Sequence, residues 1–160
     1  MARREAHRAR RRLAVAQEFF KLIPHGVQLG LVPVEVGDDY LVSRLPYGEA
    51  LVGNPFTGHI HGGVVTTVID QTSGASVVST LDPPEVVATL DLRIDHLRAA
   101  FPGTAIFAKA QCYKTTRNIA FVRCVAYEEY EDDPFATSMS TFMRSATPGR
   151  SMVEGAGEEP

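Results

Sequence analysis

The segment from Gly63 to Thr80 constrains the fold more than any other part of this chain. It runs 18 residues without a proline, and apart from Asp70 and Gln71 its side chains are apolar, small or hydroxyl-bearing. All six residues of the run 64–69 are β-branched, which favours a strand by propensity, but β-branching costs a helix only tenths of a kcal/mol per residue. Because strands are usually only about five or six residues long, the length predicts a helix that is buried nearly all round.

Strand-like runs lie on both sides of this predicted helix. Two precede it, over residues 28–37 and 39–47, with a Gly-Asp-Asp turn where they meet. Four follow it, over residues 86–97, 104–114, 119–129 and 135–145. Short turn segments separate successive strands, so neighbours in sequence should pair antiparallel. The pattern predicts an α+β fold in which about six antiparallel strands wrap around one central helix.

Strict alternation over residues 90–95 predicts which side chains face the core. Leu90, Leu92 and Ile94 should lie on the packed face, and the charged residues between them on the other.

The two ends of the chain have different patterns. Apolar residues recur with helical spacing at Leu13, Ala16, Phe20 and Ile23. This spacing predicts an extra amphipathic helix over residues 6–22, which ends before Pro24. Residues 147–160 are rich in Gly, Pro and Glu, so we expect a flexible tail there. The length of 160 residues suits one compact domain over 1–160, with its core at about 28–145.

Composition excludes several classes of protein. No apolar run approaches the ~20 residues that span a membrane, and the N-terminal residues lack the apolar core of a signal peptide. Cys112 and Cys124 lie in alternating apolar segments without CxxC spacing, which predicts buried thiols in a reducing cytoplasm. The six arginines between residues 3 and 12 are more typical of a solvated helix than of an arm for nucleic acid or membrane. We expect neither of those partners.

Three stretches carry the motifs most specific to one protein family. They are GNPFTGHIHGGVVTTVIDQTSGAS, ATLDLRIDHLRAAFPG and KTTRNIAFVRCVAY. The combination of HGG, an Asp seven residues after its second Gly, and the TLDLRIDHLR strand resembles the hotdog-fold acyl-CoA thioesterases, in particular the phenylacetyl-CoA thioesterase-like (PaaI-like) branch. The resemblance implies a hotdog fold and a cofactor-free thioester hydrolase acting on a fatty or aromatic acyl-CoA.

The resemblance assigns roles to residues around the start of the central helix. Thioester hydrolysis needs donors for the carbonyl oxygen as it gains charge, and a base or nucleophile for the carbonyl carbon. Main-chain N–H groups at a helix N-terminus suit the first task, which implies Gly62 as oxyanion donor, with Gly63 beside it in substrate binding. Asp70 is implied as general base or nucleophile. His61 and Asn54 are able to position the thioester or a water molecule.

Taken by itself, Asp70 has two interpretations. It is either catalytic or an ordinary acid that faces solvent or bonds a nearby hydroxyl such as Thr66 or Thr72. Eight residues separate Gly62 from Asp70, or ~12 Å along a helix, which is too far for both to touch one thioester. The family resolves this with a two-fold dimer that pairs Asp of one subunit with Gly of the other. A homodimer, or a homotetramer built from two dimers, is therefore implied.

The implied site is completed by four residues that come later in the chain. Thr89 matches the position of a hydroxyl that helps to hold the attacking water, although an ordinary strand residue explains it equally well. Lys114, Arg117 and Asn118 match the region that contacts the nucleotide part of coenzyme A, where cations meet phosphates. Without the resemblance, these three residues would be a polar hairpin turn.

Three other functions compete with this interpretation. The pattern His59-Ile60-His61 occurs in metal hydrolases, but two histidines are an incomplete ligand set, so we expect no metal. A hotdog enoyl-thioester hydratase would share the fold but places its catalytic groups in other motifs. A non-catalytic acyl-CoA-binding module is the third alternative, and it differs from the hydrolase in not needing the carboxylate of Asp70.

Overall fold

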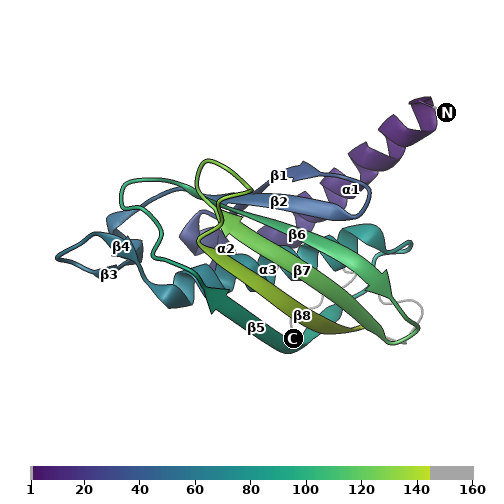
Figure 1. The fold of residues 1–160 in the computed structure, drawn as a ribbon. Coiled ribbons are helices and arrows are strands. Elements are labelled where there is room, and N and C mark those ends of the chain that lie inside the picture. Colours follow the sequence, from purple (N-terminus) through teal and green to yellow (C-terminus); the bar gives the residue numbers. More distant parts are fainter. Residues whose placement is uncertain (1, 145–160) are drawn as a thin grey trace, which may run out of the picture.

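Six antiparallel strands form one curved sheet around a central helix, α3 (Gly62–Thr80), as the sequence predicted (Figure 1). The structure is a computed structural model that describes residues 2–144, with side chains from residue 7 onward. The strand order is β1-β2-β6-β7-β8-β5. The strands are β1 (Val32–Val36), β2 (Tyr40–Leu45), β5 (Val87–His96), β6 (Ile106–Thr115), β7 (Ile119–Tyr127) and β8 (Ala136–Arg144). This α+β arrangement is the hotdog fold. The predicted tail over 147–160 lies outside the described residues.

The helix α3 forms despite its β-branched residues because tertiary packing buries it. Every residue from Gln71 to Ser79 is buried. A Cβ added at Gly74 would lie 3.4 Å from Phe142 of β8 and 3.7 Å from Phe19 of the N-terminal helix, so the sheet and that helix enclose α3 from two sides. Several Thr and Ser hydroxyls of α3 donate to main-chain carbonyls one turn earlier, which satisfies these polar groups inside the helix.

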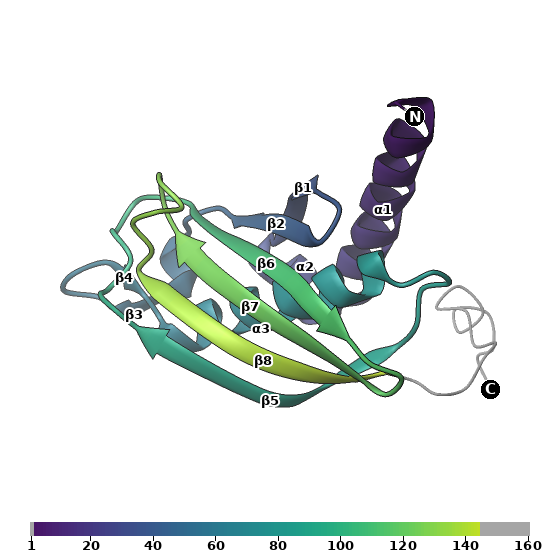
Figure 2. The ribbon, with the colours of Figure 1, turned by 45° about the vertical axis from the view of Figure 1, so that its right-hand side comes forward.

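The N-terminal region contains one helix more than the sequence predicted. The predicted amphipathic helix is α1 (Ala2–Leu22), which leans across α3 and projects beyond the sheet (Figure 2). The prediction of a strand over 28–37 is wrong in its first part. Residues 28–29 belong to α2 (Pro24–Leu29), and β1 starts only at Val32. Pro24 opens α2, and Gly30 closes it with a left-handed φ of 79°. Within residues 2–144, no helix is long and apolar enough to cross a membrane.

A β-bulge in β5 interrupts the alternation predicted over residues 90–95, so that part of the prediction is wrong. Within the described residues β5 pairs with β8 alone, and the register shifts between Thr89 and Asp91. Thr89 pairs with Phe142 and Leu92 with Ser140, both of which are buried. Leu90, which alternation placed on the packed face, is instead 54% exposed. The bulge therefore turns Thr89 toward α3.

The loop that follows β5 is fastened by an ion pair, which predicts a loss of stability in acid. The carboxylate of Glu128, which is 5% exposed, accepts two hydrogen bonds from Arg98 at 2.9 and 2.8 Å and one from the Phe101 N–H at 2.8 Å. Burial alone would raise the pKa of Glu128, but these hydrogen bonds outweigh it and hold the pKa below its ordinary value. The stabilisation is therefore complete above the unfolded-state pKa of about 4.3 and is lost as pH falls through the lower folded-state pKa.

Urea unfolding at a series of pH values tests this. The difference in unfolding free energy between the wild type and Glu128→Gln should shrink as the pH falls below about 4. A difference that stays constant with pH would contradict the prediction.

Candidate active site

The start of α3 carries one free main-chain donor. The hairpin of β3 (Val52–Asn54) and β4 (His59–Ile60) leads into the helix. His61 is the N-cap, and its Nδ1 accepts a hydrogen bond from the Gly63 N–H at 2.9 Å. Among the described residues no acceptor engages the Gly62 N–H, and a Cβ added at Gly62 would meet nothing within 4 Å. The N–H of Gly62 is thus open to a ligand, whereas that of Gly63 is occupied.

Asp70 lies on α3 two turns further on and is held by the bulged strand. It is half-buried, and its Oδ1 accepts a hydrogen bond from Thr89 Oγ1 at 2.8 Å. The hydroxyls of Thr66 and Thr72, considered from the sequence as partners for Asp70, donate to main-chain carbonyls of α3 instead. No cationic side chain of the described residues forms an ion pair with Asp70. The carboxylate therefore has one fixed oxygen and one available oxygen.

Gly62, Thr66 and Asp70 form a stripe along α3, because residues four apart lie on one face of a helix. Gly62 and Thr66 are exposed and Asp70 is half-buried, whereas the remainder of the helix from Gln71 to Ser79 is covered by the chain itself. The two ends of the stripe are ~12 Å apart at the helical rise of 1.5 Å per residue. One chain therefore does not bring Gly62 and Asp70 together.

Four other sequence-predicted residues form no hydrogen bond with this stripe among the described residues. Asn54 is the last residue of β3, and its Oδ1 accepts the Phe56 N–H at 3.0 Å, so its side chain stabilises the turn that follows. Lys114, Arg117 and Asn118 are exposed around the β6–β7 turn. That turn lies at the opposite end of the sheet from the β3–β4 hairpin (Figure 1).

One residue near the stripe was missed by the sequence reasoning. Nε2 of His25, on α2, lies 3.3 Å from Oγ1 of Thr67 on α3. The sequence signal was Pro24, which predicted only a stop for the first helix but is also the first residue of α2. The packing of α2 on α3, which carries His25 to Thr67, had no signal in the local sequence.

The two cysteines are buried, and the described residues contain no cluster of the usual metal ligands. Cys112 and Cys124 are 6% and 3% exposed. Burial raises the pKa of Cys112 to about 11 and that of Cys124 to about 12, so neither thiol forms much thiolate at neutral pH. Within the described side chains, no three or more His, Cys, Asp or Glu residues lie close enough together to hold a metal ion. His59 and His61 therefore belong to no such group.

Known proteins share both sequence and fold with this chain. The profile of the thioesterase superfamily matches residues 57–133. A Pseudomonas aeruginosa protein of known structure is 39% identical, with a TM-score of 0.77, over 83% of this chain and 98% of its own. A Halobacterium salinarum protein with a provisional esterase name is 39% identical over 75 residues, so the chain spans 50% of that relative's length. The PaaI protein of the E. coli phenylacetic acid degradation operon is 15% identical but has the same fold, with a TM-score of 0.75 over 85% of this chain and 94% of its own.

Proposed function

The chain belongs to the thioesterase superfamily, and from that premise we propose that it hydrolyses a fatty or aromatic acyl-CoA to the free acid and CoA. The observation that carries the proposal is the exposed stripe on α3, which has a free N–H at Gly62 and a carboxylate at Asp70. These are the two groups that thioester hydrolysis requires, a donor for the oxyanion and a base or nucleophile.

Asp70 fits two routes for the same overall reaction. As general base, it takes a proton from the water that attacks the carbonyl carbon; as nucleophile, it attacks that carbon itself and water later hydrolyses the mixed anhydride. In both routes the C–S bond breaks, CoA leaves as the thiol after protonation, and the Gly62 N–H donates to the carbonyl oxygen while that oxygen is negatively charged. Thr89 fixes Oδ1 of Asp70 and leaves Oδ2 free to act.

The supporting groups of the site follow from their positions. His61 holds the Gly63 N–H and caps α3, so it fixes the direction of the neighbouring Gly62 N–H. Lys114, Arg117 and Asn118 are exposed and polar, and we assign them to the phosphates and nucleotide of CoA.

The active unit in this proposal is a two-fold homodimer, which can pair further into a tetramer. Gly62 of one chain faces Asp70 of its partner, which requires the two α3 helices to lie antiparallel. Thr66 is four residues from each, so the same register places Thr66 on the two-fold axis against its own copy. The small residues of the exposed stripe allow the two helices this close approach.

Cross-linking through Thr66 tests this register directly. Thr66→Cys should give a covalent dimer with an oxidant or a short bismaleimide, because the two introduced thiols face each other across the axis. The native cysteines should not interfere, since they are 6% and 3% exposed. The product is read on a non-reducing gel beside Thr116→Cys, an exposed position on the β6–β7 turn. A monomer by light scattering, or cross-linking no faster than in Thr116→Cys, would overturn the register.

The activity itself is tested with a panel of acyl-CoA substrates. Short, medium, long and aromatic acyl chains should be compared by the release of free thiol. We expect saturable turnover of at least one class. Binding of acyl-CoA without turnover of any class would instead favour the non-catalytic binding module.

A further inference from the structure

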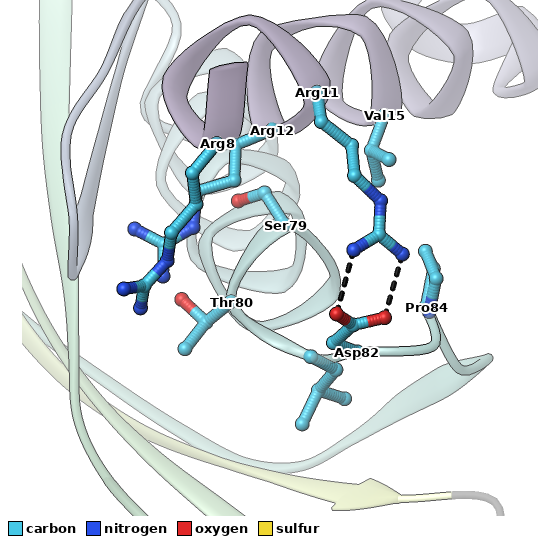
Figure 3. A pocket seen from close by; sticks show the side chains of 9 residues that line it. Arg8, Arg11, Arg12, Val15, Ser79, Thr80, Asp82 and Pro84 are labelled. Carbon is cyan, nitrogen blue, oxygen red and sulfur yellow. Dashed lines mark hydrogen bonds and ion pairs between the residues drawn. The ribbon is translucent and has the colours of Figure 1, made fainter. Parts of the chain in front are cut away.

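A cavity of about 190 Å³ lies between α1 and the C-terminal end of α3, away from the stripe that carries Asp70 (Figure 3). Its polar lining consists of Arg8, Arg11, Arg12, Ser79, Thr80 and Asp82. Three arginines thus face one carboxylate, in a chain whose net charge is -3. The cavity is therefore locally positive, and the three arginines differ in their contacts.

Two of the three arginines already have partners. Arg11 donates two hydrogen bonds of 2.6 Å to the carboxylate of Asp82, which fastens α1 to the loop after α3. Arg12 is 7% exposed and donates to the main-chain oxygen of Gly37 at 3.0 Å and to Asp38. It therefore holds the turn between β1 and β2. These contacts fix both guanidinium groups in place.

Arg8 forms no such contact with the described side chains. Among the described side chains, no carboxylate lies within 4.0 Å of its guanidinium. Burial and the nearby charge of Arg8 both lower the pKa of Arg12, so the two cations are close enough to repel each other. In Figure 3 the guanidinium of Arg8 points away from the Arg11–Asp82 pair, toward the side of Thr80. A negative group between Arg8 and Arg12 would relieve this repulsion.

We propose that the cavity binds a phosphate group, held by Arg8 and Arg12 beside the last turn of α3. Guanidinium groups match phosphate oxygens with paired hydrogen bonds, and Arg12 is already oriented by its main-chain contacts. The cavity has a volume of about 190 Å³. That space suits a phosphate or a diphosphate and is too small for a whole acyl-CoA.

Two sources can supply such a group. One is a free ligand, inorganic phosphate or a nucleotide. The other is the nucleotide part of the thioester substrate, which in that case lies here and not at Lys114, Arg117 and Asn118. Thr80 is ten residues after Asp70, or ~15 Å along α3. The binding proposal itself does not depend on thioester hydrolysis, because it is measured as binding.

Calorimetric titration with pyrophosphate and with ADP tests the proposal. The wild type should bind saturably, and Arg8→Gln should bind at least about tenfold more weakly, as expected for the loss of one charged hydrogen-bonding group. Arg10→Gln is the matched control, because Arg10 is exposed on the same helix, does not line the cavity and carries the same charge. No saturable binding, or equal weakening in both variants, would overturn the proposal, since equal weakening indicates general attraction to a basic helix. Melting curves should show that both variants fold.

Kinetics with two substrates identify the source of the phosphate. If Arg8→Gln raises KM for an acyl-CoA but not for the N-acetylcysteamine thioester of the same acid, the cavity holds the nucleotide of the substrate. If pyrophosphate binding falls while both KM values stay unchanged, the ligand is a separate phosphate compound. Failure of the thioesterase proposal would appear as absent turnover in the wild type, which leaves the pyrophosphate titration unaffected.

Discussion

Asp70→Asn should lower kcat for acyl-CoA hydrolysis by at least about 100-fold, the lower end of what a general base contributes. The amide is nearly the same size as the carboxylate and still offers an oxygen to the Thr89 hydroxyl, so the fold and the contact between α3 and β5 should persist. An amide neither accepts a proton from water near neutral pH nor attacks the thioester. Release of free thiol under saturating substrate measures the effect.

The matched control for this variant is Asp132→Asn. Asp132 is an exposed acid in the loop before β8, so this change removes the same charge without touching α3. Binding of acyl-CoA should be measured for both variants. Retained binding with lost turnover in Asp70→Asn alone supports a catalytic carboxylate, and full turnover in that variant would show that Asp70 is not catalytic.

Gly62→Pro should also remove most of the activity, with a fall in kcat of about 100- to 1000-fold, the typical cost of losing one oxyanion donor. Proline has no N–H, and Gly62 is the first residue of α3, a position at which helices accept proline. The preceding His61 has φ -62° and ψ 134°, the extended conformation that residues before proline prefer. The substitution should therefore delete the proposed donor and leave the helix intact.

Gly62→Ala separates loss of the donor from simple crowding. Alanine keeps the N–H and adds a Cβ that meets nothing within 4 Å of its own chain. We expect Gly62→Ala to retain much more activity than Gly62→Pro, and both to melt near the wild-type temperature. Equal activity in the proline variant and the wild type would exclude the Gly62 N–H as oxyanion donor.

Much of the fold could be predicted because it is encoded in local patterns. A segment of 18 residues without proline is too long for a strand, and the apolar surface that it presents must be covered by the sheet. The helix confirmed at Gly62–Thr80 shows that burial outweighed the β-branched propensity of residues 64–69. Turn residues between the later strands then determined their antiparallel order.

The errors occurred where distant parts of the chain decide the local structure. Residues 28–29 read as strand but belong to α2, which packs on α3 around Gly26 and Gln71. Leu90 fits a perfect alternation, yet a bulge opposite β8 puts it outside the packed face. Pairing with another strand, and not the residue pattern itself, determines where a bulge falls.

The sequence by itself determined the separation of Gly62 and Asp70, because helical rise depends on local geometry alone and eight residues always span ~12 Å. That separation is the reason why we propose a site shared between two chains. Only the tertiary structure decided which groups meet Asp70 and Arg11. Thr89 reaches Asp70 across 19 residues through the bulge in β5, and Arg11 reaches Asp82 across 71 residues to form the wall of the arginine-lined cavity. Such contacts depend on how the sheet curves and on how α1 packs on α3. Neither feature can be predicted from the sequence near each residue.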